Sequence, residues 1–223
     1  MELADVYTQT RTSLLDLGST LDDAQLALPV APTPGWVVRD VFAHLCGCCC
    51  DVLDGNMEGG GSPPWTAEQI RVRSDKTLAE IGEEWSARAP ELEALLRSSP
   101  PGRMSFPVYD VWTHAQDVRA AVGLLGERDE RAAVLAAAAV VVFDGNFGRS
   151  STPAARVVTE SLDTVLGEGE PVATLRTDDY ELLRMMFGRR SKAQCEAAGW
   201  EGDAVAVLDE LHLFPYPETD IQD

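Results

Sequence analysis

The feature that most constrains the fold is an apolar stripe with helical spacing in residues 38–52. Its members recur at intervals of three and four residues, the period of one helix face, and they are Val38, Val41, Phe42, Leu45, Cys48, Cys49 and Val52. Asp40 lies in the expected first turn, where a carboxylate interacts favourably with the helix dipole. A stripe this wide needs other helices to cover it, so the sequence predicts a helical bundle.

Three further segments complete that bundle. We expect helices over residues 3–27, 66–96 and 108–124, the second of them interrupted near Pro90. Loops rich in glycine and proline separate them, at residues 54–64 and 98–102. Four helices with short connections predict an up-down four-helix bundle, which we assign to residues 1–127.

The pattern changes beyond that bundle. An alanine-rich helix is expected over residues 130–143. After it come two β-prone stretches and two short helical stretches, at residues 156–159, 171–175, 180–187 and 204–213. The chain is therefore predicted to be mainly α, with a small α+β C-terminal domain at residues 128–223.

Charge and hydropathy exclude several classes of partner. Lys and Arg total 18 against 37 Asp and Glu, a formal net charge of -19, so nucleic acid and anionic membrane surfaces are expected to repel the chain. The longest wholly apolar run, residues 132–143, is far shorter than the roughly 20 residues that span a bilayer. The acidic N-terminus lacks the pattern of a secretory signal. We expect neither a membrane-spanning helix nor secretion.

The five cysteines indicate a reducing compartment. Four lie within residues 46–50 and the fifth is Cys195, and an odd, crowded set does not suit a disulfide framework. We therefore expect a cytoplasmic protein, either a monomer or a homodimer. Cys49 fits the stripe as a small apolar residue. Cys48 follows His44 by four residues, so its thiol either packs in the core, or approaches a metal ion bound by that histidine or reacts with a bound electrophile.

Two of the three histidines could form a metal site. His44 flanks the apolar stripe, and His114 follows Asp110 by one helical turn on another predicted helix. Two facing helices can aim these three side chains at one point. Two imidazoles and a carboxylate suit a borderline divalent cation, zinc above all, and leave a coordination position open as catalytic sites do. Alternatively, Asp110 and His114 make an ordinary polar contact and His44 is a hydrogen-bonded core residue.

Three motifs together resemble one known family. Residues 34–45, PGWVVRDVFAHL, resemble the second-helix signature of the DinB-like superfamily, and more closely that of its mycothiol-dependent maleylpyruvate isomerase family. Residues 110–119, DVWTHAQDVR, and the GRRS element at residues 188–191 are similar to later signatures of the same family, in the same order. The resemblance implies a DinB-like four-helix domain that binds zinc or a similar metal through His44, Asp110 and His114.

The resemblance also implies a chemistry. Mycothiol would be the cosubstrate, and an arginine of the GRRS element would contribute to the active site. Arg189 is our candidate for this arginine; the alternative is that Arg189 is a solvated surface residue.

Two positions depart from the family. Val37 stands where Ser or Thr is usual, so the N-cap hydroxyl is missing. Asp110 stands where the isomerase has Glu, which argues against maleylpyruvate isomerase itself but not against the wider family.

The sequence thus predicts a metal-dependent thiol enzyme, an S-transferase or isomerase, that acts on a small electrophilic substrate. One alternative is a metal-dependent hydrolase, which would make hydroxide from water at the same site. Another is a non-catalytic metal- or thiol-binding module.

Asp117 is expected to form a structural salt bridge with Arg119, or else to orient a ligand. Trp36 and Trp112 are expected to be core residues, and His212 is expected to be structural.

Overall fold

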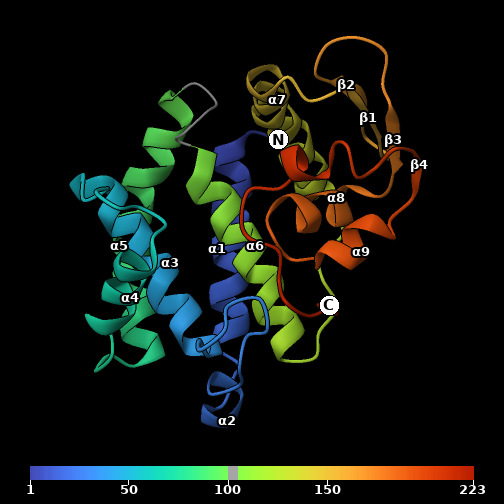
Figure 1. Ribbon diagram of the computed structural model, residues 1–223. Helices are drawn as coiled ribbons and strands as arrows, with labels where there is room; N and C mark the ends of the chain where they lie inside the picture. Colours follow the sequence, from blue (N-terminus) through green and yellow to red (C-terminus); the bar gives the residue numbers. More distant parts are fainter. Residues whose placement is uncertain (100–104) are drawn as a thin grey trace. The chain divides into compact units, whose positions relative to one another are not determined.

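The computed structural model describes residues 1–99 and 105–223, and the chain divides into two compact units (Figure 1). The first unit comprises Met1–Gly126 together with Asp223, and the second comprises Glu127–Gln222. The predicted class is confirmed, because the chain is mainly helical and carries a small four-stranded sheet in its C-terminal region.

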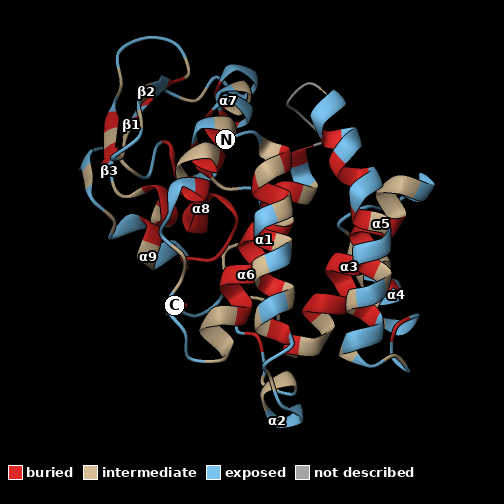
Figure 2. Cartoon of the chain, turned by 180° about the vertical axis from the view of Figure 1, so that it is seen from behind, coloured by how far each residue is buried: buried red, intermediate tan, exposed pale blue. Residues whose placement is uncertain are grey.

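A four-helix bundle forms the first unit. Its members are α1 (Leu3–Gly18), α3 (Val38–Asp54), α5 (Leu78–Ser98) and α6 (Phe106–Ala121). Around the bundle α1 contacts α5, α5 contacts α3, α3 contacts α6, and α6 contacts α1. Figure 2 shows buried residues concentrated on the sides that these helices turn toward one another. Because α3 lies between α5 and α6, it presents one side to each of them.

Helix α3 follows the predicted stripe and forms much of the core. Every residue from Val41 to Cys50 is buried. The N-cap is Val37, which offers no side-chain acceptor, but Asp40 Oδ2 accepts the Val37 N–H at 3.0 Å. One half of a capping box therefore remains. The helix ends at Gly55, whose φ of +73° is the left-handed conformation that favours glycine at this position.

The helix predicted over residues 66–96 is two helices, and the predicted break is wrong. The chain forms α4 (Pro63–Arg71), which packs on α3, and then α5. The break falls at residues 72–77, where Arg39 Nη2 donates to the carbonyls of Arg73 and Ser74, at 2.8 and 3.0 Å. Pro90 lies inside α5. Its missing N–H removes one helical hydrogen bond, but the helix continues along a buried stripe of Ile81, Trp85, Ala89, Leu92 and Leu96.

The first predicted helix also divides. It ends at Gly18 rather than near residue 27, and a short helix α2 (Asp23–Leu26) follows. Asp22 starts α2, because its Oδ1 accepts the Gln25 N–H at 2.8 Å. Most of the loop predicted over residues 98–102 lies outside the described residues.

The second unit combines the sheet with helices. The strands are β1 (Ala155–Val158), β2 (Asp163–Leu166), β3 (Ala173–Arg176) and β4 (Trp200–Gly202), in the order β2-β1-β3-β4. β1 runs antiparallel to β2 and parallel to β3, and β3 runs antiparallel to β4. The two predicted strands correspond to β1 and β3, whereas β2 and β4 were not predicted. The helix predicted at residues 204–213 is a single 3-10 turn, η2 (Leu208–Leu211).

Three α-helices belong to this unit: α7 (Glu130–Ser150), α8 (Asp179–Met186) and α9 (Lys192–Glu196). α7 packs on α8, β2 and η2, and it is seven residues longer than the expectation of 130–143. By length and composition α7 could cross a membrane, with a mean hydropathy of 1.4 over its best window. The short apolar run in the sequence therefore does not exclude a membrane span. Because a core helix passes the same test and 44% of that window is buried, this finding is weak evidence for one.

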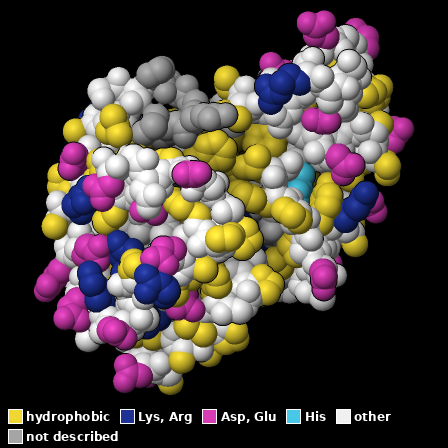
Figure 3. Space-filling view, turned by 60° about the vertical axis from the view of Figure 1, so that its left-hand side comes forward, with side chains coloured by type: hydrophobic (Ala, Val, Ile, Leu, Met, Phe, Trp, Pro, Cys, Tyr) yellow, Lys and Arg dark blue, Asp and Glu magenta, His cyan; other side chains and the backbone are white. Residues whose placement is uncertain are grey.

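The surface reflects the acidic composition. Figure 3 shows acidic side chains scattered over the drawn face of the molecule, with basic side chains among them. Many basic groups are neutralised by ion pairs, such as Arg71 with Glu68, Arg88 with Asp54, and Arg156 with Asp163. The repulsion of polyanions stays a prediction from the net charge.

Candidate metal centre

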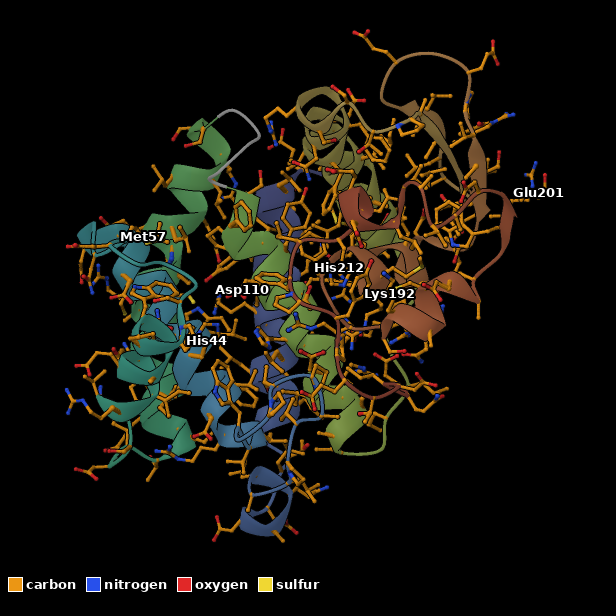
Figure 4. The ribbon with its side chains drawn as sticks, viewed as in Figure 1. His44, Met57, Asp110, Lys192, Glu201 and His212 are labelled. Carbon is orange, nitrogen blue, oxygen red and sulfur yellow. The ribbon has the colours of Figure 1, made fainter. Side chains whose placement is uncertain are left out.

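The structure brings together the three residues that the sequence singled out as metal ligands. His44 projects from α3, and Asp110 and His114 project from α6, the helix beside it. In Figure 4 His44 and Asp110 point toward one another. His44 Nε2 lies 3.3 Å from Asp110 Oδ2, and His114 Nε2 lies 3.5 Å from Asp110 Oδ1. One ligand atom from each residue lies within 4.8 Å of the others.

Gln69 of α4 fixes the orientation of His44. His44 Nδ1 and Gln69 Oε1 are 2.6 Å apart, and Gln69 Nε2 donates to Asp51 Oδ2 at 2.7 Å. Because the amide nitrogen is engaged by the carboxylate, the amide oxygen faces the imidazole. A carbonyl oxygen only accepts hydrogen bonds, so His44 carries its proton on Nδ1. When the imidazole is neutral, the lone pair of Nε2 is then the one that faces Asp110.

His114 is held in the same way from the other side. Its Nδ1 lies 3.1 Å from Oδ2 of Asp117, a fully buried carboxylate on the same helix. Donation from Nδ1–H to this carboxylate leaves Nε2 as the bare nitrogen that faces Asp110. Asp117 therefore orients a candidate ligand, which was the second of the two roles that the sequence left open.

The three inward-facing atoms form a set of acceptors. Burial opposes ionisation of Asp110, but protonated His44 and His114 beside it outweigh burial and hold the pKa of this carboxyl below its ordinary range. When both imidazoles are neutral, two nitrogen lone pairs and a carboxylate meet at one point with no proton between them. A divalent cation there would satisfy all three, so the donor set fits such an ion. The side chain of Asp110 is 32% exposed, which leaves this side of the site open.

Two tryptophans border the site. The Trp36 ring stacks on His114, with centroids 5.9 Å apart, and lies 4.9 Å from the His44 ring. The Trp65 ring meets His44 edge-on at 6.4 Å. The expectation that Trp36 is a core residue is wrong, since its half-buried ring covers both imidazoles. Trp112 is buried as expected.

Cys48 lies against this site. Its Sγ is 3.6 Å from each ring nitrogen of His44 and 3.7 Å from Gln69 Oε1. Burial and the nearby charge of Asp110 raise the pKa of the Cys48 thiol. Without a bound cation, Cys48 is therefore a protonated thiol packed on a candidate ligand.

The comparisons with known proteins can now be set beside this geometry. The family model described as mycothiol maleylpyruvate isomerase N-terminal domain matches residues 7–127. The chain belongs to this family. Among solved structures, the crystal structure of the mycothiol-dependent maleylpyruvate isomerase aligns with a TM-score of 0.54 and 12% sequence identity, over 85% of this chain and 89% of that chain.

A histidine-to-alanine mutant of the mycothiol-dependent maleylpyruvate isomerase also aligns, with a TM-score of 0.49 and 11% identity, over 82% of this chain and 86% of that chain. A comparison with curated proteins gives no match. At such low identities the structural likeness shows the fold, and the family assignment rests on the family model. The resemblance drawn from the three sequence motifs is confirmed.

The GRRS element, the third motif of the maleylpyruvate isomerase resemblance, lies in the second unit. Arg189 is 8% exposed, and its Nη1 donates to the Phe187 carbonyl at 2.7 Å, so it is not a solvated surface arginine. Arg190 is engaged by Glu181, which accepts from Nε at 2.8 Å and from Nη2 at 2.9 Å. A catalytic role for Arg189 stays a prediction. His212 stacks on Tyr216 at 3.8 Å, and burial lowers the pKa of His212 to about 4.

Sequence reasoning missed Gln69, because a single glutamine on a short helix carries no periodic signal. The available signal was Gly47, a glycine in the interior of α3. A Cβ at this position would lie 2.5 Å from Gln69 Cβ, closer than packing permits. The glycine therefore allows α4 to approach α3 closely enough for Gln69 to reach His44.

Proposed function

We propose that this chain is a metal-dependent thiol enzyme, which binds zinc or a similar divalent cation through His44, Asp110 and His114. One observation carries the proposal. Gln69 and Asp117 hold the imidazole protons on the outer side, so that two lone pairs and a carboxylate oxygen converge. A purely structural ion pair has no need of two bare nitrogens facing a carboxylate.

Each residue of the site then has a distinct task. His44 and His114 present nitrogen lone pairs in fixed directions, and Gln69 and Asp117 preserve those directions. Trp36 shields the imidazoles from water on one side. The partly exposed Asp110 marks the side from which a small molecule reaches the centre. Three protein ligands leave room for a further one, as in catalytic zinc sites.

A thiol cosubstrate is supported by the family, whose named member depends on mycothiol. A divalent cation held at the site would lower the pKa of a bound thiol and keep it as the thiolate at neutral pH. The thiolate sulfur would then add to an electrophilic carbon of a conjugated double bond in a small substrate, and the electrons of the broken π bond would move to the conjugated carbonyl as an enolate. If the enolate takes a proton from solvent and the carbon–sulfur bond persists, the product is an S-conjugate. If the adduct rotates and the carbon–sulfur bond breaks again, the substrate is isomerised and the thiol returns. Arg189 is our candidate for binding an anionic group of that substrate.

Metal analysis tests the first part. Purified wild type is expected to contain bound divalent cation, and His114→Ala is expected to lose one equivalent of it per chain. His212→Ala is the matched control, because it removes the histidine that lies outside the site. Equal metal content in wild type and His114→Ala would refute the site.

Spectroscopy of the cobalt(II) form tests the thiol. Addition of mycothiol is expected to produce a thiolate-to-metal charge-transfer absorption that grows with the thiol and is missing in His114→Ala. A hydrolase that activates water would give no such thiol-dependent band. Turnover of an electrophile in the presence of the thiol then separates an enzyme from a binding module.

A further inference from the structure

A second cluster of ligand atoms lies on the other side of α3, where this helix packs against α5. It comprises Cys46 and Cys50 of α3 and Glu84 of α5. One Sγ or carboxylate oxygen from each lies within 4.8 Å of the others, and Cys50 Sγ donates to Glu84 Oε1 at 3.6 Å. All five cysteines of the chain are free thiols, so both sulfurs are available as ligands.

Helix geometry favours a bridging ion over a disulfide between these thiols. Residues four apart on a helix have Cβ atoms about 5–6 Å apart, whereas a disulfide requires about 3.5–4.5 Å. A tetrahedral cation with metal–sulfur bonds of about 2.3 Å instead holds its two sulfurs about 3.8 Å apart. The two thiols can reach that separation by side-chain rotation, without distortion of α3.

Hydrogen bonds already hold the Glu84 side chain in a position where it could act as a third ligand. Arg73 donates to both of its oxygens, Nη2 to Oε1 at 2.6 Å and Nε to Oε2 at 3.2 Å. Lys76 Nζ donates to Oε2 at 2.7 Å. These contacts fix the carboxylate and leave Oε1 facing Cys50. An ion would take the position of the thiol proton that Oε1 now accepts.

The charges of the cluster tolerate a divalent ion. Coordination by both thiols releases two protons to solvent, so M²⁺ plus two thiols becomes a dithiolate complex plus two H⁺. The net charge of the cluster, including Arg73 and Lys76, is therefore unchanged by binding. An entry path exists on the α5 side, because the side chain of Glu84 is 25% exposed and that of Lys76 is 41% exposed.

We propose that Cys46, Cys50 and Glu84 form a second metal site, which takes a thiophilic divalent cation such as Zn²⁺ or Cd²⁺. Soft thiolate ligands select such ions. This site shares no ligand with the site of His44, Asp110 and His114 and does not depend on it. It joins α3 to α5 through Glu84, whereas the first site joins α3 to α6 through Asp110 and His114.

Titration of the chelator-treated full chain with Cd²⁺ tests the proposal. Ultraviolet thiolate-to-metal charge-transfer absorption is expected to saturate at one equivalent for this cluster. Cys50→Ser, which keeps size and polarity, is expected to abolish that absorption or weaken cadmium binding at least tenfold. Cys49→Ser is the matched control, because it removes a neighbouring thiol outside the cluster. His114→Ala is expected to retain the absorption, which separates this site from the first.

Several outcomes would overturn the second site. Absorption that persists in Cys50→Ser but vanishes in Cys48→Ser would place the ion beside His44. Absence of thiolate absorption in folded wild type would exclude the cluster as a ligand set. Loss of both free thiols under a mild disulfide oxidant, with a mass decrease of two hydrogens, would identify a disulfide pair instead. Circular dichroism of each variant establishes that a lost signal does not come from unfolding.

Discussion

Helix α3 carries two polar clusters of opposite construction, one on each side. Toward α6, imidazole protons are held outward by the acceptors Gln69 and Asp117, and acceptor atoms meet in the middle. Toward α5, the cations Arg73 and Lys76 hold Glu84 from behind, and the thiols still carry their protons. With neutral imidazoles, the first cluster has no positive charge beside its carboxylate, whereas the carboxylate of the second already has Arg73 and Lys76 beside it.

This difference shows that a list of ligand residues alone does not reveal whether a site needs a metal ion. Both clusters place three ligand atoms within the same distance of one another, yet only the partners around them reveal whether an ion is needed. A site prepared for a cation has its outer hydrogen bonds arranged so that lone pairs are left inside. A site that binds a cation in exchange for protons holds the same atoms in neutral form. We therefore expect the two sides of α3 to respond differently to substitution.

The largest effect is expected from His44→Ala. This variant removes a ligand from the α6 side, so activity with a thiol cosubstrate should fall at least about 100-fold, since metal-ion catalysis supplies several kcal/mol. The cadmium–thiolate absorption of the α5 side should remain. Steady-state rates and a cadmium titration on the same preparation measure both. Cys49→Ser is the control for activity. If His44→Ala lost both properties while still folded, the two clusters would be one site.

Gln69→Leu is expected to have the next largest effect. The substitution keeps the approximate size of a buried side chain but removes the acceptor that holds the proton on Nδ1 of His44. Loss of such an outer hydrogen bond weakens metal binding by about 10- to 100-fold. Competition with a chromogenic chelator measures the affinity, and nitrogen NMR shifts of His44 report the tautomer. An unchanged affinity would show that Gln69 merely fills space. The α5-side absorption should not change.

Gly47→Ala tests the same contact from the backbone side. A Cβ at this position would lie 2.5 Å from Gln69 Cβ and 2.6 Å from its Cγ, so α4 must shift. The strain costs about 1–3 kcal/mol, which the better helix propensity of alanine offsets by about 1 kcal/mol. Metal affinity should fall together with stability.

Gly82→Ala is the matched control for this substitution. It lies in α5, where the added Cβ would meet only Leu15 Cδ2 at 3.4 Å, an ordinary contact. Urea unfolding should show Gly82→Ala as stable as wild type or more so. If both alanine variants behaved alike, close packing of α4 on α3 would not control the site.

The sequence predicts the bundle and the ligand set because both depend on helical spacing. The stripe around Phe42 predicts that α3 packs inside a bundle, although the structure buries every residue from Val41 to Cys50. The interval from Asp110 to His114 is one turn of α6. The break between α4 and α5 could not be predicted in the same way. It is fixed by Arg39, which lies more than 30 residues earlier in the chain and binds the carbonyls of the turn. Pro90 carries the strongest local signal for a break, but the packing of α5 overrides it.

The surroundings of the ligands were beyond sequence reasoning for a similar reason. Gln69 and Trp36 reach the imidazoles from outside α3 and α6, through contacts that leave no periodic pattern. The thiol cluster was visible only as crowded cysteines. That Cys46 and Cys50 share a side of α3 follows from their spacing, but their partner Glu84 lies on a separate helix. The strand β4 was missed because three residues give too little alternation to detect. The strand β2 is as long as β1 and β3, but it begins with Asp, which is rare in strands, and only Leu166 of its four residues is buried.

A third cluster, in the second unit, sharpens the comparison because its charges are fully paired. Glu181 accepts hydrogen bonds from Arg190 Nε and Nη2, at 2.8 and 2.9 Å, and from Arg128 Nη2 at 2.8 Å. Glu84 accepts as many hydrogen bonds, from Arg73 and Lys76, but two thiols lie beside it, whereas Glu181 belongs to neither of the ligand clusters found among the described residues. We therefore expect Glu181 to contribute only to the stability of the fold.

Glu181→Gln is expected to have the smallest effect of the series on metal binding and activity, and the pH dependence of its effect on stability gives the test. Burial raises the pKa of Glu181, but Arg190 and Arg128 outweigh burial and hold it below its ordinary value. Because the folded-state pKa is the lower one, the ion pairs stabilise the fold above the unfolded pKa of about 4.3 and are lost as pH falls below it. Glu181→Gln should cost about 1–3 kcal/mol at pH 7, with a smaller difference at pH 3. Urea unfolding at both pH values measures this, with the exposed Glu168→Gln as control. A difference that is the same at both pH values would mean that Glu181 acts through packing rather than through its charge.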